Sequence, residues 1–152
     1  MKIYNITEKQ EFIREVAELT QKEWGSKTNA QEEFENKVNN TIEKILSRMN
    51  DENYCKLVLV DNNVLIGFIS IFPHDGEEKK ELSPWYATMF VKSEYRGMGY
   101  SKLLNNAVLD EAKRRGFQKL YLKTKLENYY ENFGAKFLEM LESGERLYFF
   151  EL

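Results

Sequence analysis

Hydrophobic and polar positions along the chain change their period several times, which predicts a mixture of helices and strands. In the first third, apolar residues recur every three or four positions, the spacing of one helix face. We expect one helix that begins at a capping box formed by Thr7 and Gln10 and runs to about Gly25. A second helix follows over residues 30–49. The apolar stripe of the first helix comprises Phe12, Val16, Leu19 and Trp24.

Shorter apolar runs, bounded by turn-forming residues, predict strands through the rest of the chain. One more long amphipathic helix is expected over residues 99–115, where Gly116 ends it, and a short helical turn over residues 128–133. Asp61-Asn62-Asn63 is typical of a hairpin turn. The expected strands are Lys2–Thr7, Cys55–Val60, Val64–Phe72, Pro84–Val91, Gln118–Thr124, and a terminal hairpin of Ala135–Glu142 with Glu145–Leu152.

The resulting order, β-α-α-β-β-β-α-β-α-β-β, predicts an α+β fold. A strand, helix and strand in succession imply a right-handed crossover and one parallel pair. The hairpins imply that the other pairs are antiparallel. We therefore expect a central mixed, mostly antiparallel sheet of about seven strands flanked by four helices. No linker or repeat divides the chain, so residues 1–152 are expected to form a single domain.

Composition excludes several classes of function. The formal net charge of −3 gives no basic excess for nucleic acid. A single Cys and a single His cannot build a zinc cluster, and we expect no metal. Cys55 lies in an apolar run, which favours a buried strand residue over a nucleophile. The N-terminus does not resemble a signal peptide and no apolar run could span a membrane, so we expect a cytoplasmic protein without membrane contact.

The segment Val91–Leu104 contains the clearest functional pattern. An apolar strand ends here, a glycine-containing loop follows, and an amphipathic helix begins. Free backbone N–H groups and the helix dipole together form an anion site suited to a phosphate or pyrophosphate. Gly97 and Gly99 permit positive φ, and Arg96 adds a fixed positive charge. The Walker loop and the three-glycine dinucleotide fingerprint are both excluded, because neither spacing is present.

The run Arg96–Ser101, Arg-x-x-Gly-x-Ser, resembles the Arg/Gln-x-x-Gly-x-Gly/Ala signature of the GNAT acetyltransferase superfamily. A second run, Tyr129–Ala135, resembles that family's Phe/Tyr-Tyr-Glu-Lys-x-Gly-Phe stretch. The expected order of elements is similar to the GNAT fold over nearly the whole chain. The departures are Ser101 in place of Gly or Ala, Lys123 where many members carry Asn, and Ala135 in place of Phe.

The resemblance implies that acetyl-coenzyme A is the co-substrate. Its pantetheine arm would enter where the strands Pro84–Val91 and Gln118–Thr124 separate, and a backbone N–H near Met89 or Phe90 would stabilise the oxyanion. Its pyrophosphate would lie on the amides of the glycine loop. The implied cofactor-binding residues are Met89, Phe90, Val91, Arg96, Gly97, Met98, Gly99, Tyr100, Ser101 and Lys102.

Catalytic residues are predicted partly from the same resemblance. Tyr130 aligns with the family's tyrosine beside the thioester sulfur, where a phenol can protonate the departing thiolate. Tyr129 is the competing candidate. For the base that deprotonates the amine we name Asp75, acting through water, with the neighbouring His74 as an alternative and a solvated loop end as the other interpretation. Glu81 is a weaker candidate.

Trp85 is predicted as a substrate-binding residue that forms a wall of the acceptor pocket or stacks on a cationic amine, although a core position explains it equally well. The predicted function is transfer of an acetyl group to a primary amine by direct attack on the thioester, with a small-molecule acceptor favoured. The alternatives are a protein lysine or N-terminal acetyltransferase, a non-catalytic acyl-coenzyme A sensor, and a nucleotide-phosphate binder. The resemblance is also compatible with a homodimer.

Overall fold

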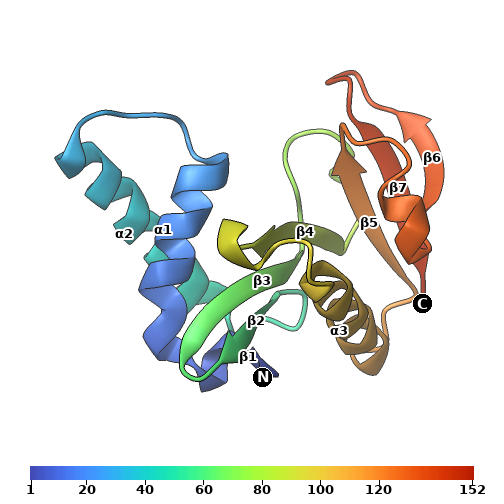
Figure 1. Ribbon diagram of the computed structural model, residues 1–152. Helices are drawn as coiled ribbons and strands as arrows, with labels where there is room; N and C mark the ends of the chain where they lie inside the picture. Colours follow the sequence, from blue (N-terminus) through green and yellow to red (C-terminus); the bar gives the residue numbers. More distant parts are fainter.

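The computed structural model describes all residues, 1–152, and contains one seven-stranded sheet (Figure 1). The strand order is β1-β2-β3-β4-β5-β7-β6. Only β4 and β5 pair in parallel, and every other neighbouring pair is antiparallel, as the sequence predicts. The strands are β1 (Lys2–Asn5), β2 (Cys55–Asp61), β3 (Val64–Phe72), β4 (Trp85–Val91), β5 (Lys119–Thr124), β6 (Lys136–Met140) and β7 (Arg146–Glu151).

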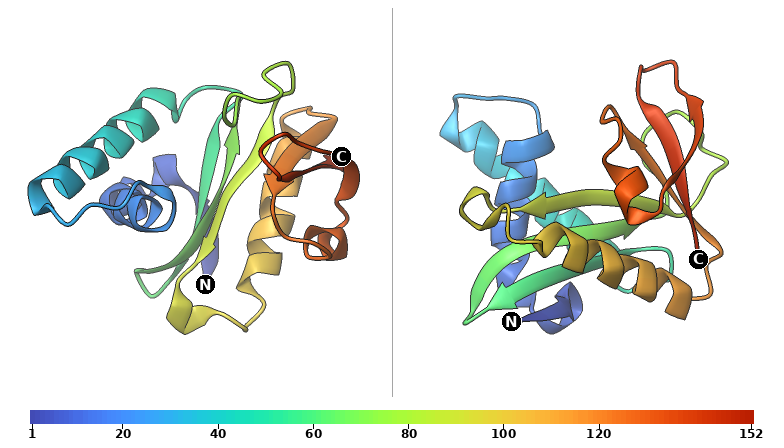
Figure 2. Two further views of the ribbon diagram at one scale, coloured as in Figure 1. Left: turned by 90° about the horizontal axis from the view of Figure 1, so that it is seen from above. Right: turned by 45° about the vertical axis from the view of Figure 1, so that its right-hand side comes forward.

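Helices cover both faces of the sheet. Figure 2 shows α1 (Ile13–Trp24) and α2 (Gln31–Arg48) together on one face and α3 (Tyr100–Arg114) on the other. One apolar cluster, which includes Val16, Ile45 and Phe68, joins α1 and α2 to strands β2 and β3. The opposite cluster joins α3 to the sheet through Leu104 and Val108. The α+β class is therefore confirmed.

Two details of the helices differ from the sequence prediction. The structure has three α-helices, and the expected fourth is a 3-10 turn over Tyr130–Phe133. The capping box predicted at Thr7 and Gln10 was wrong: Asn5 accepts a hydrogen bond from the backbone of Thr7, and Glu8 bonds back to the N–H of Asn5. The strand therefore ends directly in a 3-10 turn, and α1 begins only at Ile13.

The structure also contains the turn and the helix end that the sequence predicts. Asn62 and Asn63 both have positive φ in the β2–β3 hairpin, at 48° and 61°. Gly116 follows α3 with φ 87°. Cys55 is buried, and burial raises the pKa of its thiol to about 11, which confirms a structural rather than a nucleophilic cysteine. No helix is long and apolar enough to cross a membrane.

Strands β4 and β5 separate soon after they meet. Their register contains a single pair, Trp85 with Tyr121, and the N–H of Tyr121 donates to the carbonyl of Pro84 at 3.1 Å. A β-bulge also interrupts β4: Phe68 faces Phe90 and Ser70 faces Ala87, so β4 has one extra residue between them. In Figure 1 the part formed by β5, β7 and β6 diverges from β1–β4 as one side of a V. The opening lies between the two parallel strands.

Candidate active site

The loop between β4 and α3 is shaped by its backbone. A 3-10 turn over Ser93–Tyr95 leads to Arg96, whose Nε donates to the carbonyl of Val91 at 2.8 Å. Gly97 and Gly99 adopt φ of 79° and 84°, and a Cβ at either position would meet nothing within 4 Å. The glycines are therefore required by the left-handed backbone rather than by lack of space.

The start of α3 presents backbone N–H donors that no side chain caps. Gly99 is its N-cap, no side chain bonds to the cap, and the first turn has no acidic residue. The first N–H groups of a helix have no partner within it, and the dipole places partial positive charge there. Arg96, fixed by its bond to Val91, lies beside them at the wall of the same cavity. These groups together form a site for a phosphate or pyrophosphate.

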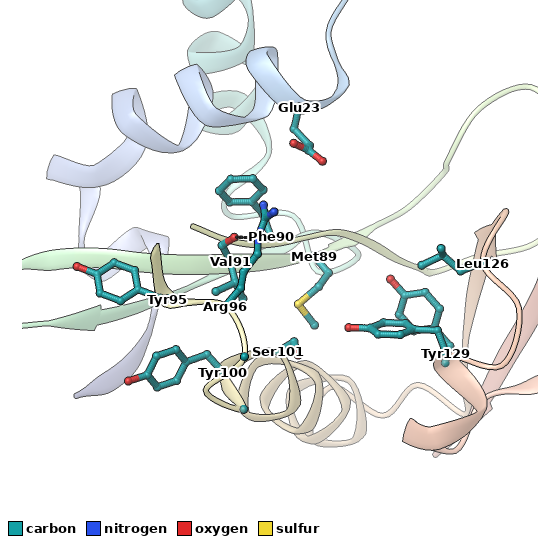
Figure 3. A pocket seen from close by; sticks show the side chains of 13 residues that line it. Glu23, Met89, Phe90, Val91, Tyr95, Arg96, Tyr100, Ser101, Leu126 and Tyr129 are labelled. Atoms are coloured by element: carbon teal, nitrogen blue, oxygen red, sulfur yellow. Dashed lines mark hydrogen bonds between the residues drawn. The ribbon is translucent and has the colours of Figure 1, made fainter. Parts of the chain in front are cut away.

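A cavity of about 380 Å³ begins at this helix and reaches to the opening between β4 and β5. We call it the donor cavity. Figure 3 shows the thioether of Met89 pointing into it, between the start of α3 and Tyr129. Its lining residues are Glu23, Met89, Phe90, Val91, Tyr95, Arg96, Gly97, Gly99, Tyr100, Ser101, Leu126, Tyr129 and Tyr130.

Tyr130 lies at the far end of the donor cavity within an aromatic cluster. Its ring meets Tyr129 edge-on at 4.8 Å between centroids and Tyr86 at 5.7 Å. Burial raises the pKa of its phenol to about 12, and Tyr129 adds to the shift. The phenol therefore keeps its proton at neutral pH and is suited to donate it.

A second cavity of about 530 Å³ adjoins the first, and we call it the acceptor cavity. The two share the residues Glu23, Met89, Leu126 and Tyr130. The rest of its wall comprises Trp24, Asp75, Tyr86, Ala87, Thr88, Leu122, Lys123, Thr124, Lys125 and Glu145. One cleft thus has an anion site at one end and a polar, charged chamber at the other.

Comparison with known proteins shows the family of the chain. The sequence model of the acetyltransferase (GNAT) family matches residues 13–135. The chain belongs to the GNAT acetyltransferase family. That family is one of acetyltransferases, and the anion site of the donor cavity fits the pyrophosphate of acetyl-coenzyme A.

Relatives agree with this assignment. N-alpha-acetyltransferase 30 of Schizosaccharomyces pombe is 34% identical over 82 residues, which are 51% of this chain and 54% of that protein, so the match spans about half of the relative's length. An aminoglycoside 6'-N-acetyltransferase complexed with coenzyme A superposes with a TM-score of 0.71 at 18% identity, over 98% of this chain and 94% of the other. The paiA N-acetyltransferase of Thermoplasma acidophilum, also with coenzyme A, gives 0.67 at 20% identity over 100% of both chains. At these identities the structural matches establish the shared fold.

Within the GNAT cleft, most residues predicted to hold the co-substrate lie together. Eight of them line the donor cavity, and the exceptions are Met98 and Lys102, whose side chains are exposed outside it. Asp75 lies in the wall of the acceptor cavity, whereas His74 and Glu81 are exposed and lie outside both walls. Burial raises the pKa of Asp75, and Lys123 opposes the shift.

Trp85 lies away from the GNAT cleft. Its side chain is 1% exposed, and its indole N–H donates to the carbonyl of Leu82 at 2.9 Å. Its ring packs against Leu141 and Leu147 in a small core cluster. An amine in the acceptor cavity cannot reach this ring, so the structure corrects the prediction of a substrate-stacking role: Trp85 joins the sheet to the terminal hairpin.

Sequence reasoning missed several residues of the acceptor cavity. Trp24 was assigned to the buried stripe of the first helix, yet it is 48% exposed and meets the rings of Phe68 and Phe90 edge-on at 6.4 and 6.2 Å. Its place in the last turn of α1, directly before Gly25, was the available signal, since a stripe residue at a helix end can project beyond the core. Thr88 and Glu145 carried no comparable signal.

The ring of Tyr86, which packs against Tyr130, is held by a buried hydrogen bond. The hydroxyl of Tyr86, whose ring contacts Tyr130, donates to Oδ1 of Asn105 at 2.9 Å. Asn105 is 1% exposed, and its Nδ2 has no hydrogen-bond partner. Its amide therefore depends on the tyrosine for the single hydrogen bond of its side chain.

We expect Tyr86→Phe to lower the free energy of unfolding by about 1–3 kcal/mol, because both polar atoms of Asn105 would then be buried without a partner. The double variant Tyr86→Phe/Asn105→Leu should regain most of this loss, since it removes the orphaned amide. Urea denaturation of the single and double variants measures both values. A double variant less stable than the single one would contradict this account.

Proposed function

We propose that the protein transfers the acetyl group of acetyl-coenzyme A directly to a primary amine on a small molecule. The observation that supports this most strongly is the meeting of the two cavities at Met89 and Tyr130. A thioester at that meeting point would be open to a nucleophile from the acceptor cavity. An acceptor volume of about 530 Å³ falls in the range of small-molecule sites.

On the donor side, the pyrophosphate of the co-substrate lies on the N–H groups at the start of α3, beside Arg96. The pantetheine arm follows β4 through the opening that the single Trp85–Tyr121 pair leaves between β4 and β5. Backbone groups of Met89 and Val91 bond to its amides. This assignment uses the place inside the sheet where two neighbouring strands leave their facing edges unpaired, so that an extended chain can bond to them.

In the chemical step, the neutral amine attacks the thioester carbon. A backbone N–H near Met89 or Phe90 stabilises the oxyanion that forms. When the intermediate collapses, the carbon–sulfur bond breaks and Tyr130 donates its proton to the thiolate. The nitrogen, which carries a positive charge after the attack, loses one proton to form the amide, and that proton restores the Tyr130 phenol through solvent in the cleft. Burial makes this phenol a weaker acid than a free tyrosine, so it stays protonated at neutral pH and stabilises the departing thiolate by a hydrogen bond as it gives up its proton.

Charge in the acceptor cavity supports a cationic substrate. Three carboxylates, Glu23, Asp75 and Glu145, face two lysines, Lys123 and Lys125. An amine with a second cationic group would pair with the acids. The aminoglycoside acetyltransferase among the structural matches acts on such a compound class by its name. The 34% identity with N-alpha-acetyltransferase 30 supports the second candidate, a peptide N-terminus.

The deciding experiment measures thiol release from acetyl-coenzyme A with aminoglycosides, polyamines, amino acids and short peptides as acceptors. We expect a signal that depends on the amine and is largest for compounds with several amino groups. Calorimetric titration with coenzyme A runs in parallel. A signal with peptides alone would select the second candidate, whereas binding without turnover for any acceptor would contradict catalysis and favour an acyl-coenzyme A sensor.

A further inference from the structure

A lysine is buried beneath the acceptor cavity. Lys56 is on β2 and is 3% exposed. Its Nζ lies 5.3 Å from the ring centre of Phe68 and 5.5 Å from that of Phe72. No carboxylate pairs with it, and Ser70 is its hydrogen-bond partner. A buried lysine without a counter-ion is rare and costs stability unless the amine is neutral.

A short hydrogen-bond chain leads from this lysine to the cleft. Nζ of Lys56 lies 2.6 Å from Oγ of Ser70, which lies 2.6 Å from Oγ1 of Thr88. The three residues stand on three successive strands, β2, β3 and β4. Thr88 lies in the β4 bulge with φ 48°, and it is one of the residues that line the acceptor cavity. The bulge therefore brings a buried amine into contact with the acceptor space through two hydroxyl groups.

Few other titratable groups lie near this chain of hydrogen bonds. Next to Lys56 on β2 is the Cys55 thiol, whose pKa burial raises to about 11. Burial lowers the pKa of Lys56 to about 7, and Cys55 opposes this only in part. At the other end, Thr88 shares the cavity wall with Tyr86, Tyr130 and the charged side chains Glu23, Asp75, Lys123, Lys125 and Glu145.

We propose that Lys56 accepts the proton of the attacking amine through Ser70 and Thr88. This inference rests on the proposed function, since it requires an amine acceptor in that cavity. Thr88 is the group that touches the acceptor, and Lys56 acts through it. The role differs from that of Asp75, which lies in the wall on the β3–β4 loop and has no bond to this chain.

The acceptor ammonium loses a proton to Oγ1 of Thr88 while the proton of Thr88 moves to Oγ of Ser70. The proton of Ser70 moves to Nζ, so that –NH2 of Lys56 becomes –NH3+ and the acceptor becomes a neutral amine. After the acetylated product leaves, the same chain returns the proton to solvent in the cavity. One proton is released per turnover, as acetylation of an ammonium group requires.

The protonation state of Lys56 also determines which group donates and which accepts in each hydrogen bond from Lys56 to Thr88. A charged Nζ must donate to Ser70, which then donates to Thr88, and the Thr88 hydroxyl points its hydrogen at the cavity. A neutral Nζ can accept, and Thr88 then presents a lone pair to the acceptor ammonium. Activity should therefore follow the neutral form of Lys56.

The experiment compares pH profiles of kcat/KM for the wild type, Lys56→Met, Lys56→Arg and Thr88→Val, with the best acceptor from the thiol-release panel. The wild type should show a rise with an apparent pKa near 7 in addition to the ionisation of the acceptor itself. All three variants should lose this rise and fall about 100-fold at mildly basic pH. A second acceptor with a different amine pKa separates the two ionisations.

Two control variants define specificity. Lys44→Met removes an exposed lysine of α2 and should keep the wild-type profile. His74→Gln should also keep it, because imidazoles as a class titrate in the same range and must be excluded. Loss of the rise in His74→Gln, or its persistence in Lys56→Met, would overturn the inference. Absence of wild-type turnover would overturn the proposed function and this inference with it.

Thermal unfolding gives a readout that does not need an acceptor. The pKa of Lys56 is lower in the folded state than its unfolded value of about 10.4, so between pH 7 and that value the unfolded chain binds more protons. The stability of the wild type should therefore rise with pH over this interval. The rise should be absent in Lys56→Met, and at neutral pH this variant should melt no lower than the wild type. An identical pH dependence in both proteins would show that Lys56 stays charged and would overturn the inference.

Discussion

Replacing Ser101 by Asp is expected to weaken coenzyme A binding by at least about 100-fold while leaving the fold intact. Ser101 lies in the first turn of α3 and in the wall of the donor cavity. A carboxylate about 5 Å from a pyrophosphate charge, at an effective dielectric constant of about 20, costs about 3 kcal/mol. The same carboxylate favours the helix itself, because it complements the dipole at the N-terminus. Affinity and thermal stability should thus change in opposite directions.

Calorimetric titration with coenzyme A measures the affinity, and thermal unfolding measures the fold. The Ser101→Asn variant carries a side chain of nearly the same size as Asp but without its charge. It should bind coenzyme A within about tenfold of the wild type. Ser101→Ala, which restores the residue that the family signature prefers, should bind at least as well as the wild type. Wild-type affinity in the Asp variant would remove the start of α3 from the binding site.

The second large effect is expected for Tyr130→Phe, which should lower kcat about 100-fold and leave the dissociation constant of coenzyme A unchanged. The ring still packs against Tyr86 and Tyr129, so the cavity keeps its shape. What is lost is the proton for the departing thiolate, a contribution of the size usual for general acids. Steady-state kinetics with calorimetry on the same samples separates the two quantities.

Tyr129→Phe is the matched control, because it removes the same atom from the neighbouring ring. Tyr129 is 38% exposed and lines only the donor cavity, and this variant should keep kcat within a few-fold of the wild type. A large loss in Tyr129→Phe with full activity in Tyr130→Phe would transfer the acid role to Tyr129. Equal activity in both variants would leave protonation of the thiolate to solvent.

Much of the fold could be predicted because its signals are local. Asn62-Asn63 and Gly116 end their elements through their own backbone preferences, and the structure places them as expected. The α1 boundary was missed for a physical reason: Asn5 and Glu8 form the same type of cap two residues earlier. Two adjacent capping patterns compete, and the tertiary position of the strand end decides between them.

In the site, too, the residues close together in the sequence could be predicted and those brought together by the fold could not. Every cofactor position implied by the family resemblance lies in the contiguous segment 89–102, where the motif that carries the resemblance can be recognised along the chain. The acceptor cavity draws its wall from the end of α1, the β3–β4 loop, β4, β5 and the turn before β7. No spacing along the chain predicts that assembly. Trp24 and Lys56 are understood only once the sheet brings β3 and β4 beside them.

The narrow connection between β4 and β5 has a mechanical consequence. Only the bridge at Trp85 and Tyr121 resists a change in the angle between the two halves of the sheet through backbone bonds, and the stack of Tyr86 on Phe150, at 5.1 Å, holds the same end. The other end is free of strand pairing. At that end the angle of the V is therefore set by side-chain packing alone, without backbone hydrogen bonds between β4 and β5.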